Sequence, residues 1–80
     1  MEFKKPKIGA IYEHFKGHIV EVLLIVRHTE TEEEMIVYKE LGINKDWGKD
    51  SLWVRPLGMF LETVERDGKK FPRFKLVKNS

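Results

Sequence analysis

The chain has 80 residues, no cysteine and a formal net charge of +2, and 41% of its residues are hydrophobic. These values fit one domain with one apolar core, exclude disulfides and thiolate-bound metals, and fall short of the charge excess typical of a dedicated nucleic-acid-binding protein. No apolar run approaches the ~20 residues that span a bilayer, and the basic start lacks the apolar segment of a signal peptide. We therefore expect a soluble, cytoplasmic protein that has no membrane partner.

The chain divides into a flexible basic N-terminus over 1–7, a single small β domain over 8–77 and a short tail over 78–80. Within the domain, the apolar residues of 8–12 predict a first strand. The polar residues of 13–17, which end in a glycine, predict the turn that follows it.

The segment 19–28 is rich in β-branched residues and predicts the longest strand. Because side chains alternate between the two faces of a strand, its cleaner core face consists of Val20, Val22, Leu24 and Val26. This assignment places His28 at the end of the inward row, near a rim. The acidic segment 29–33 predicts a hairpin connection to a return strand over 34–41, whose inward face the sequence leaves open.

A short strand is predicted over 52–55, after a glycine- and aspartate-containing loop. In this strand we expect Leu52 and Val54 to point into the core. Trp53 and Arg55 would then lie together on the opposite face.

Pro56 ends that strand because it has no amide hydrogen to donate. Helical spacing follows it, through Leu57, Phe60, Leu61 and Val64. The glycine within this run favours one helical turn over a full helix. Asp67-Gly68 then predicts a two-residue hairpin turn between strands over 61–66 and 69–77.

These elements favour a mainly β fold: a small SH3-like, partly open barrel of about five strands, with one short helical turn before the final hairpin. The alternative is an α+β meander with a genuine helix over 57–64.

Several short motifs occur in a fixed order along the chain: Tyr12-x-His14-Phe15-Lys16-Gly17, Arg27-His28-x-Glu30-Thr31, Val37-Tyr38, Trp53-Val54-Arg55-Pro56-Leu57-x-Met59-Phe60 and Val64-x-x-x-Gly68-x-x-x-Pro72-Arg73-Phe74. Together they resemble a family of small bacterial proteins, the domain-of-unknown-function family numbered sixteen fifty-three, over residues 10–77. The chain departs from the family pattern at Val20, where relatives tend to have an aromatic residue, and at Gly42, where they tend to have a tyrosine. The loop before Leu52 also looks longer. The resemblance implies no activity.

The three histidines raise the question of metal binding. His14 and His18 are four residues apart, but Gly17 lies between them in a predicted turn, so no helix presents them together. We therefore expect neither a metal nor another cofactor. His28 and Glu30 could act as an acid–base pair, which makes a small hydrolase or isomerase the least favoured function, because no nucleophile is placed beside them.

The more informative set combines aromatic and guanidinium groups. If the strands 34–41, 52–55 and 69–77 are neighbours, one outer face carries Tyr38, Trp53, Arg55 and Arg73. A guanidinium binds anions through two hydrogen bonds, and an aromatic ring stacks on planar groups. The alternative is that both arginines support the fold by pairing with acidic residues, among Glu62, Glu65 and Asp67.

The sequence therefore predicts a non-enzymatic binding module for an anionic ligand, either nucleotide-like or a nucleic acid. The candidate ligand-binding residues are Tyr12, His14, Lys16, His28, Tyr38, Trp53, Arg55 and Arg73. The alternative is an SH3-like peptide- or protein-interaction module with an apolar groove, formed by Tyr12, Tyr38 and Trp53. The oligomeric state stays open.

Overall fold

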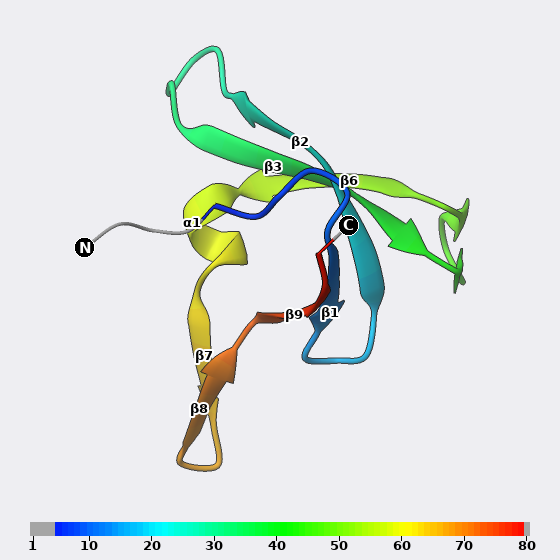
Figure 1. Cartoon of the computed structure of the whole chain (residues 1–80), viewed down its shortest axis with the longest axis vertical. Helices are drawn as coiled ribbons and strands as arrows, with labels where there is room; N and C mark the ends of the chain where they lie inside the picture. The colour runs from blue at the N-terminus through cyan, green and yellow to red at the C-terminus, as the bar shows by residue number, and fades with distance from the viewer. Residues whose placement is uncertain (1–4, 80) are drawn as a thin grey trace.

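The computed structural model describes residues 5–79 and shows a mainly β protein (Figure 1). Its main sheet is antiparallel and has five strands in the order β6-β3-β2-β1-β9. The bounds of these strands are β1 Ile11–His14, β2 Ile19–Arg27, β3 Glu34–Leu41, β6 Leu52–Pro56 and β9 Phe74–Lys78. Among the described strands no closed barrel forms, because the edge strands β6 and β9 are not hydrogen-bonded to each other.

Two small hairpins and one helical turn complete the fold. The helical turn is α1 Leu57–Phe60, and the hairpins pair β4 Ile43–Asn44 with β5 Gly48–Lys49 and β7 Thr63–Arg66 with β8 Lys69–Pro72. Residues 1–4 of the predicted flexible N-terminus and residue 80 of the predicted tail lie outside the described residues. Within 5–79, no helix has the length and apolar character needed to cross a membrane.

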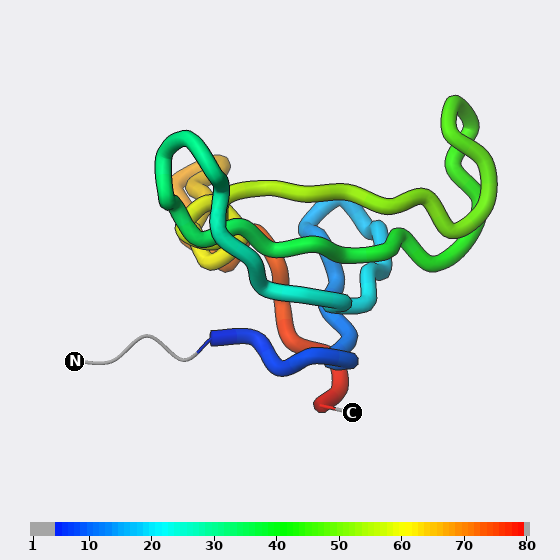
Figure 2. Tube along the Cα trace, turned by 90° about the horizontal axis from the view of Figure 1, so that it is seen from above, coloured from blue at the N-terminus to red at the C-terminus, as the bar shows by residue number. Residues whose placement is uncertain are grey.

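The sheet bends so that its two ends approach each other. Figure 2 shows β3 and β6 running side by side, whereas β1 and β9 turn away from them. The bend in β2 coincides with a shift in its pairing with β3 between Val22 and Leu24. A bulge of this kind adds one residue to a strand and increases its local twist. The result is a concave face that holds the core.

An aromatic cluster forms the centre of this core. The rings of Phe60 and Phe74 are stacked, with centroids 4.0 Å apart, and Tyr38 packs against both at 5.7 Å. Tyr12 meets Phe60 edge-on at 5.1 Å. The buried residues of the whole core come from three strands and the helical turn. They are Val20, Val22, Ile36, Tyr38, Leu57, Phe60 and Phe74.

The predicted inward face of β2 is right only for its first half. Val20 and Val22 are buried, but Leu24 is 55% exposed and Ile25 packs against the core instead. The bulge explains the change, because one extra residue exchanges the two faces of the strand beyond it. His28 consequently does not end an inward row and lies exposed in the turn after β2.

The predicted faces of the strand over 52–55 are reversed in the structure. Leu52 and Val54 are 63% and 57% exposed, whereas Trp53 and Arg55 are half-buried on the concave side. The pairing register gives the reason. Trp53 lies opposite the buried Tyr38 of β3, and directly opposite residues share a face of the sheet.

Other boundaries also differ. The first strand begins at Ile11 rather than residue 8, and the loop over 42–50 contains the β4–β5 hairpin. The helix is a single turn, so the genuine helix over 57–64 is wrong. The predicted last strand over 69–77 divides at Arg73, because β8 pairs with β7 and β9 pairs with β1.

The two predicted hairpin connections are confirmed. Asp67 and Gly68 have φ values of 52° and 75°, as the favoured two-residue hairpin turn requires. At the acidic connection between β2 and β3, the amide of His28 donates to the carbonyl of Glu33 at 2.9 Å. Both turns therefore follow from their local sequences.

Candidate functional site

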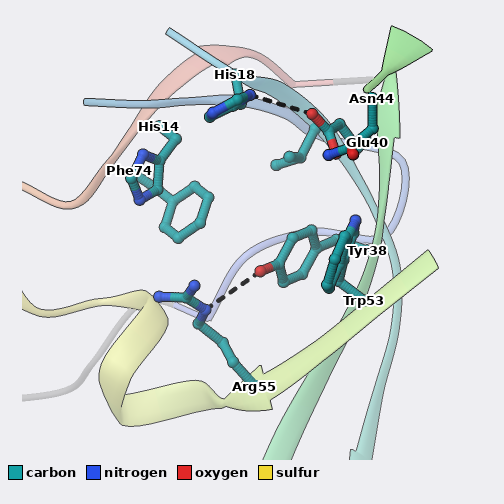
Figure 3. A pocket seen from close by; sticks show the side chains of 9 residues that line it. His14, His18, Tyr38, Glu40, Asn44, Trp53, Arg55 and Phe74 are labelled. Atoms are coloured by element: carbon teal, nitrogen blue, oxygen red, sulfur yellow. Dashed lines mark hydrogen bonds and ion pairs between the residues drawn. The ribbon is translucent and has the colours of Figure 1, made fainter. Parts of the chain in front are cut away.

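A cavity of about 220 Å³ opens on the concave face, beside the aromatic core (Figure 3). It lies between the β1–β2 turn, the second half of β3, strand β6 and the start of β9. Its lining residues are His14, His18, Val20, Tyr38, Glu40, Asn44, Trp53, Arg55 and Phe74. We call this cavity the arginine pocket.

One end of the arginine pocket is cationic. The guanidinium of Arg55 lies over the ring of Phe74, with its Cζ atom 5.3 Å from the ring centroid. Its Nε atom donates a hydrogen bond to the hydroxyl of Tyr38 at 3.2 Å. Among residues 5–79, no carboxylate pairs with Arg55. The side chain is held in place by a ring and a hydroxyl, so neither of these contacts supplies a negative charge to balance the guanidinium.

The other end holds a carboxylate whose oxygens are already bound. Glu40 is only 12% exposed, and its Oε2 atom lies 3.1 Å from Nδ1 of His18. Its Oε1 atom accepts hydrogen bonds from Asn44 Nδ2 at 3.1 Å and from Ser51 Oγ at 3.3 Å. Ser51 Oγ in turn accepts from the indole nitrogen of Trp53 at 2.9 Å. This network fixes polar groups along one wall and orients Trp53.

The remaining walls are aromatic. Tyr38 and Phe74 are packed against each other, and Trp53 lies beside Tyr38 on the neighbouring strand. Trp47, from the β4–β5 hairpin, supports Trp53 in an edge-on contact at 6.2 Å. Figure 3 shows Arg55 reaching in from β6 toward the neighbouring rings of Phe74 and Tyr38, with His18 and Glu40 on the other side of the pocket. The arrangement suits a planar group that carries a negative charge at one end.

The environment of His14 favours the neutral form of its ring. Burial lowers the pKa of its imidazole, and Arg55, the imidazole of His18, Arg73 and Lys16 lower it further. Its Nδ1 atom accepts a hydrogen bond from the amide of Lys16 at 3.1 Å, so the neutral ring carries its proton on Nε2. His14 therefore adds a hydrogen-bond donor to the pocket rim without adding a charge.

The structure brings together four of the eight candidate site residues, on the face opposite to the one expected. His14, Tyr38, Trp53 and Arg55 line the arginine pocket. They occupy the concave face rather than an outer face. Arg73 does not join them: it lies between β8 and β9, and its guanidinium pairs with Glu62 at 2.6 Å.

The other candidates lie elsewhere. Tyr12 packs into the core, where burial raises the pKa of its hydroxyl. Lys16 lies over the ring of Phe15, with 5.9 Å between its Nζ atom and the centroid. The Nδ1 atom of the exposed His28 accepts hydrogen bonds from the amides of Glu30 and Thr31 at 3.1 and 3.3 Å, so it stabilises its own turn.

Four polar or aromatic lining residues are not among the candidate ligand-binding residues: His18, Glu40, Asn44 and Phe74. Glu40 could have been found from the sequence, because it is two residues after Tyr38 on the same strand and therefore shares its face. Asn44 and Phe74 have no such signal: Asn44 lies in the β4–β5 hairpin, where it is hydrogen-bonded to Glu40, and Phe74 lies on the edge strand β9, far from β6 in the strand order. The described residues contain no group of three or more His, Cys, Asp or Glu side chains suited to a metal ion.

Fold and pocket together define a small, mainly β single-domain protein whose concave face combines aromatic rings with one arginine that has no carboxylate partner among residues 5–79. The chain belongs to the family described as Protein of unknown function (DUF1653), whose model matches residues 10–76. This finding confirms the resemblance seen in the motifs. The chain is also similar to the crystal structure of a DUF1653 protein from Bordetella bronchiseptica, with 28% identity, a TM-score of 0.76, and coverage of 99% of this chain and 92% of that chain. No curated protein matches the sequence.

Proposed function

We propose that this protein is a non-enzymatic binding module that holds an anionic, nucleotide-like group in the arginine pocket. One observation carries the proposal: the guanidinium of Arg55 is fixed over Phe74 and hydrogen-bonded to Tyr38, yet pairs with no carboxylate among residues 5–79. A guanidinium presents a rigid fork of donors that matches phosphate and carboxylate oxygens. Arg55 would bind the anionic part of the ligand.

The rest of the pocket supports a planar, polar-edged group such as a nucleobase. The half-buried Trp53 offers aromatic surface for stacking, which is tolerant of base identity, and the buried rings of Tyr38 and Phe74 form the apolar wall beside it. Glu40 and Asn44 are already hydrogen-bonded to each other and to neighbouring groups, so they form a fixed polar wall next to the edge of such a group. The volume of about 220 Å³ lies below the range of about 300–1,000 Å³ for drug-sized ligands, so the pocket would take one base-sized group.

The curvature of the sheet supports a further part of the proposal, that the fold is a partly open SH3-like barrel. Arg55 on edge strand β6 contacts Phe74 on edge strand β9, so the two edges approach each other across the concave face. Ligand binding in the open side of such a barrel would leave its closed side as scaffold. We also propose that the protein acts in the cytoplasm, where nucleotides are available.

The proposal is tested by titrating the protein with a nucleoside monophosphate, the matching nucleoside and inorganic phosphate, while following tryptophan fluorescence. We expect the monophosphate to bind most tightly, because it engages both ends of the pocket, and to bind more weakly at about 200 mM than at about 50 mM salt. Arg55→Ala should reduce that affinity, while Arg27→Ala, which removes an arginine outside the pocket, should not. The absence of a response to all three compounds at low salt would contradict the proposal.

The alternative is a peptide- or protein-interaction module, and one observation favours it. Leu24, Leu52 and Val54 expose apolar side chains on the outer face of the sheet, and such patches often mark protein contacts. Of the groove residues first considered, Tyr12 is packed against Phe60 rather than beside Trp53. Binding that persists at high salt and is unaffected by Arg55→Ala would favour this alternative.

A further inference from the structure

A second cavity, of about 250 Å³, adjoins the arginine pocket. Its lining residues are Glu13, His14, Phe15, Phe71, Pro72 and Lys75. His14 lines both cavities, so the two adjoin at this side chain. We call the second cavity the phenylalanine surface, after Phe15 and Phe71.

Aromatic rings continue without a break from one cavity to the other. Phe74, in the arginine pocket, meets His14 edge-on at 4.9 Å, and His14 meets Phe15 at 4.5 Å with an interplanar angle of 30°. Phe15 then contacts Phe71 of β8 at 5.6 Å. Phe15 and Phe71 are partly exposed, so they are not sealed within the core. The molecule thus offers stacking surface at successive positions along one path.

Positively charged side chains lie next to the aromatic rings of this path. The guanidinium of Arg66 lies 5.4 Å from the centroid of Phe15, and the ammonium of Lys16 lies 5.9 Å from it. Lys75 lines the cavity itself, and Glu13 stands opposite Lys75 in the β1–β9 pairing. One cation, Lys75, and one carboxylate, Glu13, line the cavity, and Arg66 and Lys16 add two cations beside the ring of Phe15.

We infer that the ligand is a single-stranded nucleic acid, with one nucleotide in the arginine pocket and an adjacent one on the phenylalanine surface. This inference rests on the proposed function. A mononucleotide would use only the first cavity, whereas a strand uses both and passes over His14. Aromatic platforms flanked by basic side chains bind single strands in this way, because every base has a face to stack and every linkage carries a phosphate. The small net charge of the whole chain does not oppose this, since the relevant cations lie along one path.

The test compares a nucleoside monophosphate with a single-stranded tetranucleotide of the same base, in DNA and RNA form, by tryptophan fluorescence at several salt concentrations. We expect the tetranucleotide to bind at least about tenfold more tightly, since each stacked base contributes about 5- to 150-fold. Its affinity should also depend more steeply on salt, because it contacts more phosphates.

Two variants locate the additional binding. Phe71→Ala should weaken tetranucleotide binding about tenfold and leave the monophosphate unchanged, because Phe71 does not line the arginine pocket. Lys75→Ala, which removes an exposed side chain and keeps the fold, should lower the salt dependence of the tetranucleotide alone. Met59→Ala and Lys45→Ala, at exposed positions outside both cavities, are the matched controls.

Equal affinities for the monophosphate and the tetranucleotide would overturn the inference and leave the proposed function standing. The inference would also be overturned if Phe71→Ala and Lys75→Ala bound the tetranucleotide as the wild type does. If neither compound binds at low salt, the proposed function fails, and the inference fails with it.

Discussion

Two arginines adjoin Phe74, and their surroundings are opposite in kind. Arg55 places its guanidinium over the ring and has no acidic partner among residues 5–79. Arg73 precedes Phe74 in the chain, and its guanidinium is bound by Glu62 at 2.6 Å. The backbone of Arg73 also accepts a hydrogen bond from the amide of Phe15 at 3.0 Å and donates one to the carbonyl of Glu62 at 2.9 Å.

The two arginines differ in their partners and not in residue type: an acidic partner makes Arg73 part of the scaffold, and the lack of one among residues 5–79 is the reason that Arg55 is the proposed ligand-binding arginine. Arg73 joins the end of the β7–β8 hairpin to the β1–β2 turn, and its charge is compensated at that junction. Arg55 is positioned by aromatic and hydroxyl contacts, which leave its charge uncompensated. The following predictions test this contrast.

Phe74→Ala should have the largest effect, a loss of stability, because Phe74 lies between the core and the guanidinium of Arg55 and directly follows Arg73 in the chain. Its ring is buried and stacked on Phe60, and Phe→Ala changes in a core typically cost about 3–5 kcal/mol. Urea unfolding measures the loss, with Leu76→Ala, at an exposed position on the same strand, as the control. A loss below about 1 kcal/mol would show that this ring is not part of the core. Phe74→Leu, which keeps apolar volume, allows ligand binding to be measured without the ring.

Arg55→Lys should have the next largest effect, on affinity rather than on stability. Lysine keeps the positive charge but lacks the planar fork that binds two oxygens and stacks on a ring. We expect an affinity for the monophosphate about tenfold lower, since one charge-assisted hydrogen bond contributes about 1.5–3 kcal/mol. Wild-type affinity in this variant would mean that Arg55 acts only as a point charge. Arg66→Lys, at a position outside the arginine pocket, is the control.

Local features of the fold were predictable from the sequence, and the long-range ones were not. The Asp67-Gly68 turn, the acidic turn and the helical turn depend on neighbouring residues. The reversal of Trp53 and Arg55 does not, because the faces of β6 follow from its register with β3. The alternation of side chains shows only which residues share a face of a strand. Because both faces of β6 carry an apolar residue, it does not show which face is buried.

The same limit applies to the site. Tyr38, Trp53 and Arg55 were selected together because adjacent strands were expected to bring them to one face, and the structure does so. Phe74 is not predicted beside them, since β9 pairs with β1 at the far edge of the sheet and reaches Arg55 only because the whole sheet is curved. Nor could the sequence decide which arginine would meet Glu62, because either could reach an acidic residue.

Arg73→Ala should cost about 1 kcal/mol or less in stability and leave monophosphate affinity unchanged. Glu62 is half exposed and regains water when its partner is removed, so the ion pair contributes modestly. Arg73→Met sharpens the test. It keeps the apolar stem and removes the buried Nε atom, which has no hydrogen-bond partner among the described residues. We expect Arg73→Met to be at least as stable as Arg73→Ala in urea; a less stable Met variant would contradict this account.

The smallest expected effect is on the pKa of His14, and it compares the two arginines directly. Burial holds this pKa below its ordinary value of 6.5, and among the charged groups Arg55 contributes more than Arg73. Because the folded protein takes up the proton less readily than the unfolded chain, stability should fall as the pH decreases below about 6.5 and level off below the folded-state pKa. His14→Asn should remove this dependence, and His28→Asn, in an exposed turn, should not.

NMR titration of the arginine variants compares the two arginines directly. The pKa of His14 should rise more in Arg55→Ala than in Arg73→Ala; the reverse order would place Arg73, rather than Arg55, at the pocket.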